Sequence, residues 1–244
     1  MMKPEIDTLK AWIEQSKRIV FFGGAGVSTE SKIPDFRSDT GLYKQKYPYP
    51  AETMLSHSFF EKHPEEFYDF YRNVMIYPDA KPNRAHYVLT ALEQAGKLTA
   101  VVTQNIDGLH QAAGSRNVYE LHGSVHRNYC MECGKTYGLD AITGSTGIPR
   151  CSCGGIIRPD VVLYEEGLDQ DTLDCAVTAI AGADMLIVGG TSLAVYPAAG
   201  LIRYYRGNRL VLVNLQPTPY DDRADLCLHA SLGETLEAAI GGEY

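Results

Sequence analysis

Four short, nearly uninterrupted apolar runs constrain the fold of this chain more than any other feature of its sequence. The runs are residues 18–22, 99–103, 185–188 and 209–215. Such runs, rich in β-branched residues, are typical of parallel strands that are buried on both faces. Segments with helical spacing lie between them, for example Leu173, Val177 and Ile180. Strands and helices in alternation predict an α/β fold with a doubly wound (Rossmann-like) parallel sheet.

Two stretches interrupt the alternation. Residues 39–81 are rich in aromatic residues and prolines, and residues 125–158 hold four of the six cysteines. We predict a single domain over residues 1–244, in which these two stretches form a small inserted module with helical and zinc-ribbon character. The Rossmann-like part is then made of residues 1–38, 82–124 and 159–244.

The charge balance argues against some partners. Lys and Arg number 22, Asp and Glu number 30, and the net charge of −8 disfavours nucleic acid or a membrane surface as an obligatory partner. No apolar signal region is present in the N-terminal sequence MMKPEIDTLKAW. Six cysteines in such a chain predict a reduced, cytoplasmic protein. The sequence makes no prediction of the oligomeric state.

The first apolar run leads into a glycine-rich loop at residues 23–26. Glycines after a strand let the backbone approach a pyrophosphate, and a following helix N-terminus, which Ser28 and Thr29 can cap, offers free N–H donors. A tight turn would also explain the glycines, and the dehydrogenase fingerprint is incomplete because its third glycine is missing. Residues 33–37 continue as Ile-Pro-Asp-Phe-Arg, either a functional loop or a salt-bridged surface turn.

Polar residues also follow the later apolar runs, where open α/β sheets bind their ligands. Gln104, Asn105 and Asp107 offer groups suited to ribose hydroxyls or a carboxamide, although the last two can equally cap a helix. Residues 190–193 and Asn214 suit phosphate and ribose contacts, or they form simple turns. The sequence therefore predicts a ligand site at this edge of the sheet.

One of the seven histidines has a comparable position. His122 follows the short predicted strand 118–121, so we expect it at the same sheet edge. Its imidazole titrates near neutral pH and can act as a general base. A structural role is the competing interpretation for any single histidine.

Two cysteine pairs form the strongest local motif. Cys130-x2-Cys133 and Cys151-x-Cys153 are separated by 17 residues and flanked by glycines. This pattern predicts a tetrahedral structural zinc with four thiolate ligands and no open position for catalysis. A redox or disulfide pair is the alternative, and the absence of an export signal disfavours it.

Taken together, these segments resemble the sirtuins, the NAD-dependent protein deacylases, and in particular those of bacterial type, over nearly the whole chain. The family's Gly-Ala-Gly-Ile-Ser and Ile-Pro-Asp-Phe-Arg correspond to residues 24–28 and 33–37. Its Thr-Gln-Asn-Ile-Asp, His-Gly and Gly-Thr-Ser-Leu correspond to residues 103–107, 122–123 and 190–193. The resemblance implies removal of acetyl groups from protein lysines, giving nicotinamide and 2′-O-acetyl-ADP-ribose.

The resemblance also implies roles for individual residues. His122 is the implied catalytic base, NAD the implied co-substrate, and acetyl-lysine proteins or peptides the implied partners. The implied NAD contacts are Ala25, Thr29, Phe36, Arg37, Gln104, Ile106, Asp107, His122, Thr191, Ser192, Asn214 and Leu215. The implied substrate contacts are Val162 and Tyr68. The implied ligands of one structural Zn²⁺ are Cys130, Cys133, Cys151 and Cys153.

The chain departs from the family pattern in three places. Lys32 and Glu165 stand where sirtuins usually have glycine. Tyr68 matches the tyrosine of the Tyr-x-x-Arg motif that sirtuins use for succinyl-lysine, but Tyr71 occupies the arginine position and Arg72 comes one residue later. Residues one apart on a helix point about 100° away from each other, so we predict a preference for acetyl or another neutral acyl group.

Three rival functions remain at this stage. Mono-ADP-ribosyl transfer would use the same NAD site. A zinc-ribbon nucleic-acid binder is a different class, which residues 125–160 disfavour because they carry four Lys or Arg against three Asp or Glu. A nicotinamide dehydrogenase is disfavoured by the incomplete fingerprint.

Overall fold

A computed structural model describes residues 3–36, 41 and 47–240. Its larger sheet has the strand order β3-β2-β1-β7-β8-β9, and every pair of neighbouring strands is parallel. The strands are β1 (Ile19–Gly23), β2 (Leu98–Thr103), β3 (Val118–Glu120), β7 (Met185–Gly189), β8 (Leu210–Val213) and β9 (Leu226–Leu228). The predicted doubly wound α/β fold is confirmed, while the three-residue strand β9 was not among the predicted apolar runs.

Side chains of the central strand alternate between two apolar layers. Ile19 and Phe21 pack with residues of α1, α5 and α9, whereas Val20 and Phe22 pack with residues of α8 and η5. These helices are α1 (Lys3–Gln15), α5 (Arg84–Gln94), α8 (Gln170–Gly182), η5 (Ala198–Tyr204) and α9 (Leu232–Ile240). Because both faces are covered, every residue of β1 and β7 is buried, which explains their uninterrupted apolar sequence.

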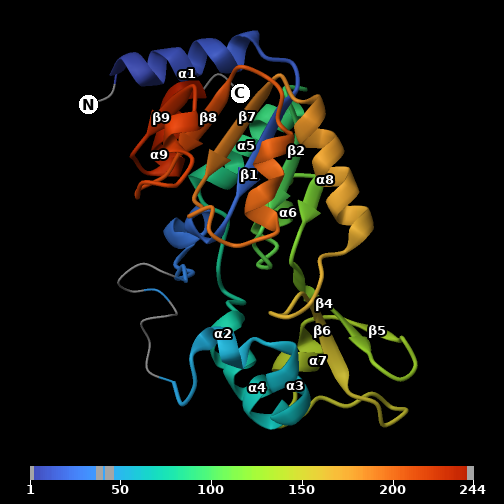
Figure 1. The fold of residues 1–244 in the computed structure, drawn as a ribbon. Helices are drawn as coiled ribbons and strands as arrows, with labels where there is room; N and C mark the ends of the chain where they lie inside the picture. The colour runs from blue at the N-terminus through green and yellow to red at the C-terminus, as the bar shows by residue number, and fades with distance from the viewer. Residues whose placement is uncertain (1–2, 37–40, 42–46, 241–244) are drawn as a thin grey trace.

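A smaller antiparallel sheet with the order β5-β4-β6 lies below the large one in Figure 1, beside the short helices of the small part. Its strands are β4 (Gly123–Cys130), β5 (Thr136–Tyr137) and β6 (Ile157–Val161). The helices are α2 (Ala51–Met54), α3 (His57–Lys62), α4 (Pro64–Phe70), the π-helical turn η4 (Tyr71–Met75) and α7 (Asp140–Thr143). Aromatic side chains of the helices and apolar residues of the sheet share one buried cluster.

Polar side chains fix where several helices begin. Asn83 and His86 form a reciprocal capping box at the start of α5. Asp169 accepts a hydrogen bond from the Thr172 amide at the start of α8. None of the helices in the described part of the chain combines the length and the apolar character that a membrane span requires.

The strand order reverses beside β1, which pairs with β2 on one side and β7 on the other. In open α/β sheets, ligands bind in the crevice at the carboxyl ends of the strands at this reversal. The glycine-rich loop after β1 lies at this point, with the short α6 (Leu109–Ala113) after β2 and the turns η1 (Ala25–Val27) and η2 (Thr29–Ser31) after β1.

Candidate active site

A cavity of about 1370 Å³ lies at the carboxyl ends of the large sheet's strands and extends to the small part. Its lining includes most residues of the first loop between 24 and 36, residues 104–109 after β2, and residues 190–192 and 195–197 after β7. Residues 161–166, which run from the last residue of β6 in the small sheet, line it as well. The volume exceeds the 300–1,000 Å³ that is usual for small-molecule pockets, so it has room for an extended dinucleotide and part of a second substrate.

The loops after β1 and β7 touch each other through their glycine backbones. The Gly26 amide donates to the Gly190 carbonyl at 2.8 Å, and Gly190 has a φ of +60°. A Cβ on Gly190 would lie 2.4 Å from the Val27 nitrogen, so a larger residue does not fit there. The glycines therefore bring the two loops together, while the predicted helix start is a pair of 3₁₀ turns.

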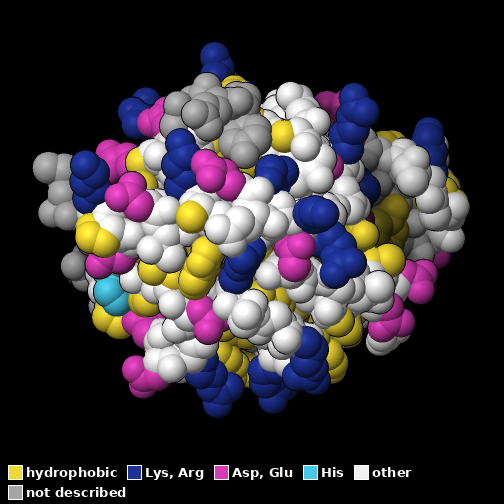
Figure 2. Space-filling model, turned by 90° about the horizontal axis from the view of Figure 1, so that it is seen from above, with side chains coloured by type: hydrophobic (Ala, Val, Ile, Leu, Met, Phe, Trp, Pro, Cys, Tyr) yellow, Lys and Arg dark blue, Asp and Glu magenta, His cyan; other side chains and the backbone are white. Residues whose placement is uncertain are grey.

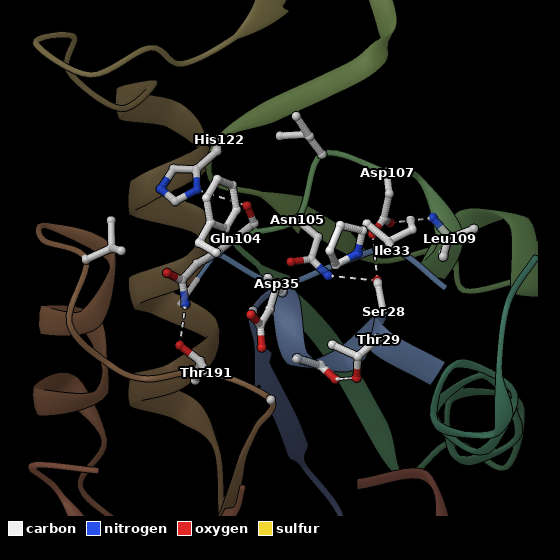
Figure 3. Close-up of a pocket in the computed structure, with 18 of the residues that line it drawn as sticks. Ser28, Thr29, Ile33, Asp35, Gln104, Asn105, Asp107, Leu109, His122 and Thr191 are labelled. Atoms are coloured by element: carbon white, nitrogen blue, oxygen red, sulfur yellow. Dashed lines mark hydrogen bonds between the residues drawn. The ribbon is translucent and has the colours of Figure 1, made fainter. Parts of the chain in front are cut away.

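The hydroxyl of Ser28 links two residues of the loop after β2 (Figure 3). It donates to Asp107 Oδ2 at 2.6 Å and accepts from Asn105 Nδ2 at 3.1 Å. The prediction that Ser28 caps a helix is wrong, because its side chain makes no capping hydrogen bond. Its hydroxyl instead fixes the orientation of the Asp107 carboxylate.

Asp107 is held at both carboxylate oxygens. Oδ1 accepts from the Leu109 amide at 2.9 Å, and Oδ2 accepts from Ser28. Burial raises the pKa of Asp107, although the hydrogen bonds from Ser28 and Leu109 oppose that shift. Each oxygen keeps a second lone pair, so the carboxylate can still accept an N–H from a ligand.

His122 precedes β4, at the junction between the two parts of the molecule (Figure 3). Its Nδ1 lies 2.9 Å from the Gln104 carbonyl oxygen, which fixes Nδ1 as the protonated nitrogen. Nε2 is then the nitrogen with the free lone pair, on a ring that lines the cavity. Burial lowers the pKa of His122, against the opposing effect of the Gln104 hydrogen bond, so the imidazole is neutral near pH 7 and can accept a proton.

The remaining polar contacts tie Gln104 to the loop after β7. Gln104 Nε2 donates to the Thr191 hydroxyl at 3.0 Å, and that hydroxyl accepts from the Leu193 amide at 3.2 Å. Asn214, at the end of β8, donates through Nδ2 to the Gln216 carbonyl at 2.7 Å. Loops that follow β1, β2, β7 and β8 thus contribute to one continuous wall.

The four paired cysteines converge at the end of the small sheet. Their sulfurs all lie within 4.8 Å of one another, with Cys130 Sγ 3.5 Å from Cys153 Sγ and Cys133 Sγ 3.7 Å from Cys151 Sγ. A tetrahedral zinc with Zn–S bonds of about 2.3 Å places its sulfurs about 3.8 Å apart. The donor set therefore fits a structural zinc ion, and no disulfide joins these residues.

The surroundings of the sulfurs also fit a metal-bound thiolate cluster. The Tyr137 hydroxyl donates to Cys151 Sγ at 2.9 Å, and the Cys153 amide and this hydroxyl lower the pKa of Cys151 to about 5. A Cβ on Gly155 would lie 2.7 Å from Cys130 Sγ. The absence of a side chain at Gly155 thus gives the Cys130 sulfur the space that it needs in a four-thiolate site.

Comparison with known proteins agrees with this geometry. Residues 24–197 match the model of the Sir2 family. The chain is 61% identical over 244 residues to an NAD-dependent protein deacetylase of Clostridium acetobutylicum, covering 98% of this chain and 100% of the relative.

The chain belongs to the Sir2 family. Two solved Sir2 structures have the same fold. A complex of Sir2 with a p53 peptide and NAD⁺ superposes with a TM-score of 0.85 at 41% identity and covers 100% of both chains. A complex with a deacetylated p53 peptide, 2′-O-acetyl-ADP-ribose and an inhibitor gives a TM-score of 0.83 at 40% identity and covers 96% of both chains. The predicted sirtuin membership is confirmed.

Most of the residues to which the sirtuin resemblance assigns NAD or substrate contacts line this same cavity. These are Ala25, Thr29, Phe36, Gln104, Ile106, Asp107, His122, Thr191, Ser192, Asn214, Leu215 and Val162. Arg37 lies outside the described residues. The Val162 amide donates to the His122 carbonyl at 3.0 Å, which ties the predicted substrate segment to the predicted base.

The structure does not bring Tyr68 to the cavity. Tyr68 is 0% exposed, and its hydroxyl donates to the Ile157 carbonyl at 2.7 Å inside the small part. The predicted substrate contact at Tyr68 is therefore corrected: the residue belongs to α4 and is buried, with its hydroxyl bonded to β6. Arg72 is directed to another loop, where its Nη2 donates to the Gly147 carbonyl at 2.6 Å.

The two residues that replace the family's usual glycines both have a left-handed backbone. Lys32 has a φ of +66° and Glu165 a φ of +77°. Most residues with a Cβ avoid this conformation, which explains why glycine is usual at both positions. The Glu165 carboxylate accepts from the Ser58 amide at 2.9 Å and from its hydroxyl at 3.0 Å, a contact with the start of α3 that glycine cannot make.

Sequence reasoning missed two contributors to the site. The sequence predicts a helix cap at Ser28, whereas its contacts with Asn105 and Asp107 join residues 77 and 79 positions apart. His126 received no functional role, yet it lines the cavity and its Nε2 lies 3.0 Å from the Asp107 carbonyl oxygen. No local pattern marks either residue, because the contacts form only when the loops after β1 and β2 meet each other and strand β4.

Proposed function

We propose that this chain removes acetyl groups from lysine residues of proteins in an NAD-dependent reaction. The observation that carries the proposal is His122, a neutral imidazole fixed by the Gln104 carbonyl, with Nε2 as its basic nitrogen, on the wall of a cavity large enough for two substrates. The relatives named above, and the peptide and acetyl-ADP-ribose in the solved Sir2 complexes, support the same reaction.

When bound, NAD supplies the ADP-ribosyl group that accepts the acetyl group, with loss of nicotinamide. Residues of this chain would hold it in an extended form: Ala25 and Thr29 near the phosphates, and Thr191, Ser192, Asn214 and Leu215 near the adenosine. Asp107, oriented by Ser28 and Leu109, would accept from the carboxamide N–H. Phe36 and Ile106 line the cavity and would exclude water from the reacting carbon.

His122 would act as the general base of the reaction. Its neutral Nε2 would take a proton from the ribose hydroxyls of the bound nucleotide, so that a neighbouring hydroxyl attacks the acyl carbon. Val162 is the proposed contact of the acyl-lysine, because it lines the cavity and is bonded through its amide to the His122 backbone. One water would be consumed as the lysine amine leaves, and free lysine, nicotinamide and 2′-O-acetyl-ADP-ribose would be the products.

Surface charge is consistent with protein rather than nucleic acid as the substrate. On the face shown in Figure 2, Lys and Arg side chains are interspersed with Asp and Glu side chains. The chain as a whole carries a net charge of −8, which opposes the phosphate backbone of nucleic acid. A cytoplasmic location remains a prediction from the sequence.

Replacing the proposed base tests the function. We expect His122→Ala to lower deacetylation of an acetylated peptide by about 10²–10⁴-fold, the usual contribution of a general base, and to change NAD affinity only a few-fold. His63→Ala is the matched control, because the His63 side chain is 44% exposed and lies in the small part. A folded His122→Ala variant with most of its turnover would contradict the assignment.

The products separate deacetylation from mono-ADP-ribosyl transfer. With a peptide that carries a labelled acetyl group, deacetylation places the label on ADP-ribose. Transfer would instead add the mass of ADP-ribose to the peptide and leave the acetyl group on lysine. Mass spectrometry of both products decides between the two functions.

A further inference from the structure

A second cluster of metal-ligating side chains lies at the edge of the large sheet. Among the described residues, Asp221, Cys227 and His229 form the only group besides the four cysteines that brings three such ligand atoms within 4.8 Å of one another. Asp221 belongs to η6 (Asp221–Arg223), Cys227 to the edge strand β9, and His229 follows that strand. The catalytic proposal uses none of these residues.

The distances between the ligand atoms match those of a metal site. His229 Nε2 lies 3.3 Å from Asp221 Oδ2 and 3.8 Å from Cys227 Sγ. Tetrahedral zinc with ordinary bond lengths separates a nitrogen from an oxygen by about 3.4 Å and a nitrogen from a sulfur by about 3.6 Å. The three atoms can therefore bind one ion with only small movements of their side chains.

The outer atoms of two of these ligands are already held by neighbouring residues. His229 Nδ1 lies 3.4 Å from the Asn214 carbonyl oxygen, so a proton on Nδ1 leaves the lone pair of Nε2 directed toward the other two ligands. Asp221 Oδ1 accepts from the Thr218 amide at 3.0 Å and the Thr218 hydroxyl at 2.7 Å, which leaves Oδ2 for the metal. Outer contacts of this kind orient the ligands in established metal sites.

We propose that Asp221, Cys227 and His229 bind a divalent cation of borderline softness, Zn²⁺ in particular. A thiolate, an imidazole and a carboxylate are the three ligand types that zinc takes in proteins, and magnesium or calcium would not select a thiolate. Three protein ligands leave the fourth position to water, in contrast to the closed four-cysteine site. The ion would join the turn that contains η6 to the edge strand β9.

Metal titration of the whole protein tests this site. The chain is stripped of zinc that exchanges readily, and Zn²⁺ is then added in competition with a chromogenic chelator. We expect a total of two bound zinc ions per wild-type chain at the end of the titration. Cys227→Ser should bind a total of one per chain, at the four cysteines. Cys175→Ser is the matched control, because Cys175 is exposed on α8 and belongs to neither cluster.

Two further variants distinguish a defined three-ligand site from nonspecific metal binding at the protein surface. Asp221→Asn and His229→Gln should each weaken the second equivalent by at least about tenfold and leave the first unchanged. Co²⁺ in place of Zn²⁺ should give a thiolate charge-transfer band that decreases in Cys227→Ser. Equal zinc stoichiometry and affinity in wild type and Cys227→Ser would overturn the proposal and leave the three residues as a hydrogen-bonded cluster without a metal.

Thermal or chemical unfolding gives a readout that does not depend on catalysis. The reference is the unfolding equilibrium constant of the wild type at a Zn²⁺ concentration that saturates only the four cysteines. When free Zn²⁺ is raised to 100 times the dissociation constant of the second site, this constant should fall about 100-fold. The same addition should leave Cys227→Ser unchanged. Stabilisation of equal size in the variant would contradict the assignment.

Discussion

The two parts of the molecule are stabilised in different ways. In the large part, Ile19, Val20, Phe21 and Phe22 of the central strand are all 0% exposed between two apolar layers. The small sheet that the structure describes has three strands, one of only two residues, and two of the four paired cysteines are exposed. Apolar burial therefore accounts for the large part, whereas the outer end of the small sheet depends on the ion that its cysteines would hold.

Loss of that ion should produce the largest difference between the two parts, because only the small part should unfold. Structural zinc contributes on the order of 10 kcal/mol to small metal-binding modules, so Cys151→Ser should abolish zinc binding at this site, unfold the outer small sheet and stop deacetylation. The fluorescence of Trp12, which packs on the core of the large part, should stay native. Cys175→Ser should retain zinc and activity. An active Cys151→Ser variant without zinc would refute the difference between the two parts.

Acid should weaken the large part through two buried histidines. His86 and His110 are 0% and 1% exposed, with ring centroids 4.7 Å apart. Burial lowers the pKa of His86 from 6.5 to about 4, and burial together with His86 lowers the pKa of His110 to about 3. The unfolded chain takes up protons at these residues below about pH 6.5, while the folded chain does not.

The contribution of these two neutral histidines to the free energy of unfolding is therefore fully present above about pH 6.5. It is lost as the pH falls toward 4, by up to about 2.7 kcal/mol per pH unit for the pair. The expected loss between pH 7 and pH 5 is about 4 kcal/mol. Urea unfolding followed by Trp12 fluorescence measures it, with His63→Gln as an exposed control. A denaturation midpoint that does not move between pH 7 and pH 5 would show that the large part does not limit acid stability.

Changing the acyl group of the substrate tests whether a cation is available in the cavity where the two parts meet. Among the described residues that line the cavity, Arg84 is the only Lys or Arg, and it pairs with Glu237 at 2.9 Å within the large part. Arg72 of the small part is occupied by the Gly147 carbonyl. A succinyl carboxylate would lose water without gaining a cation, at a cost of about 2 kcal/mol or more.

We therefore expect catalytic efficiency on an acetylated peptide to exceed that on the succinylated peptide at least about tenfold. Steady-state kinetics on one peptide sequence with either group gives the ratio. Equal rates would mean that a cation from one of the two parts reaches the acyl group.

Lys32 and Glu165, the two left-handed residues that stand at the family's usual glycine positions, should give the smallest effects. Lys32→Gly should stabilise the protein by up to about 1 kcal/mol, because glycine adopts this backbone without strain. Glu165→Gly relieves the same strain but loses both hydrogen bonds to Ser58, so its net effect should be near zero or unfavourable. Urea unfolding compares the two variants. Equal stabilisation by both would show that the Ser58 contacts contribute nothing.

The sequence was sufficient where a local pattern has one physical cause. Strands such as β1 and β7 are buried on both faces and must be apolar throughout, so their positions could be read directly. The paired cysteines and flanking glycines likewise specify a four-thiolate cluster, because only close turns bring two sulfurs from neighbouring positions together. Strand β9 escaped prediction because three residues are too few to show a pattern.

The site was predictable only in part, since its residues come from loops that follow different strands. Sirtuin motifs indicated most of the residues that line the cavity. They gave the wrong place for Tyr68, whose hydroxyl is bound by Ile157, a residue 89 positions away. Helical spacing relates Tyr68 to Arg72, but it says nothing about which neighbouring segment each side chain meets.

By itself, the sequence determined the α/β class, the zinc ligands and the order of the functional loops, because each depends on residues that are close along the chain. The tertiary structure alone decided that Ser28 orients Asp107 and that the Gln104 carbonyl sets the tautomer of His122. These contacts depend on how the loops at the carboxyl ends of the parallel strands converge. That convergence is set by packing of the whole sheet and leaves no periodic or spacing signal in the sequence.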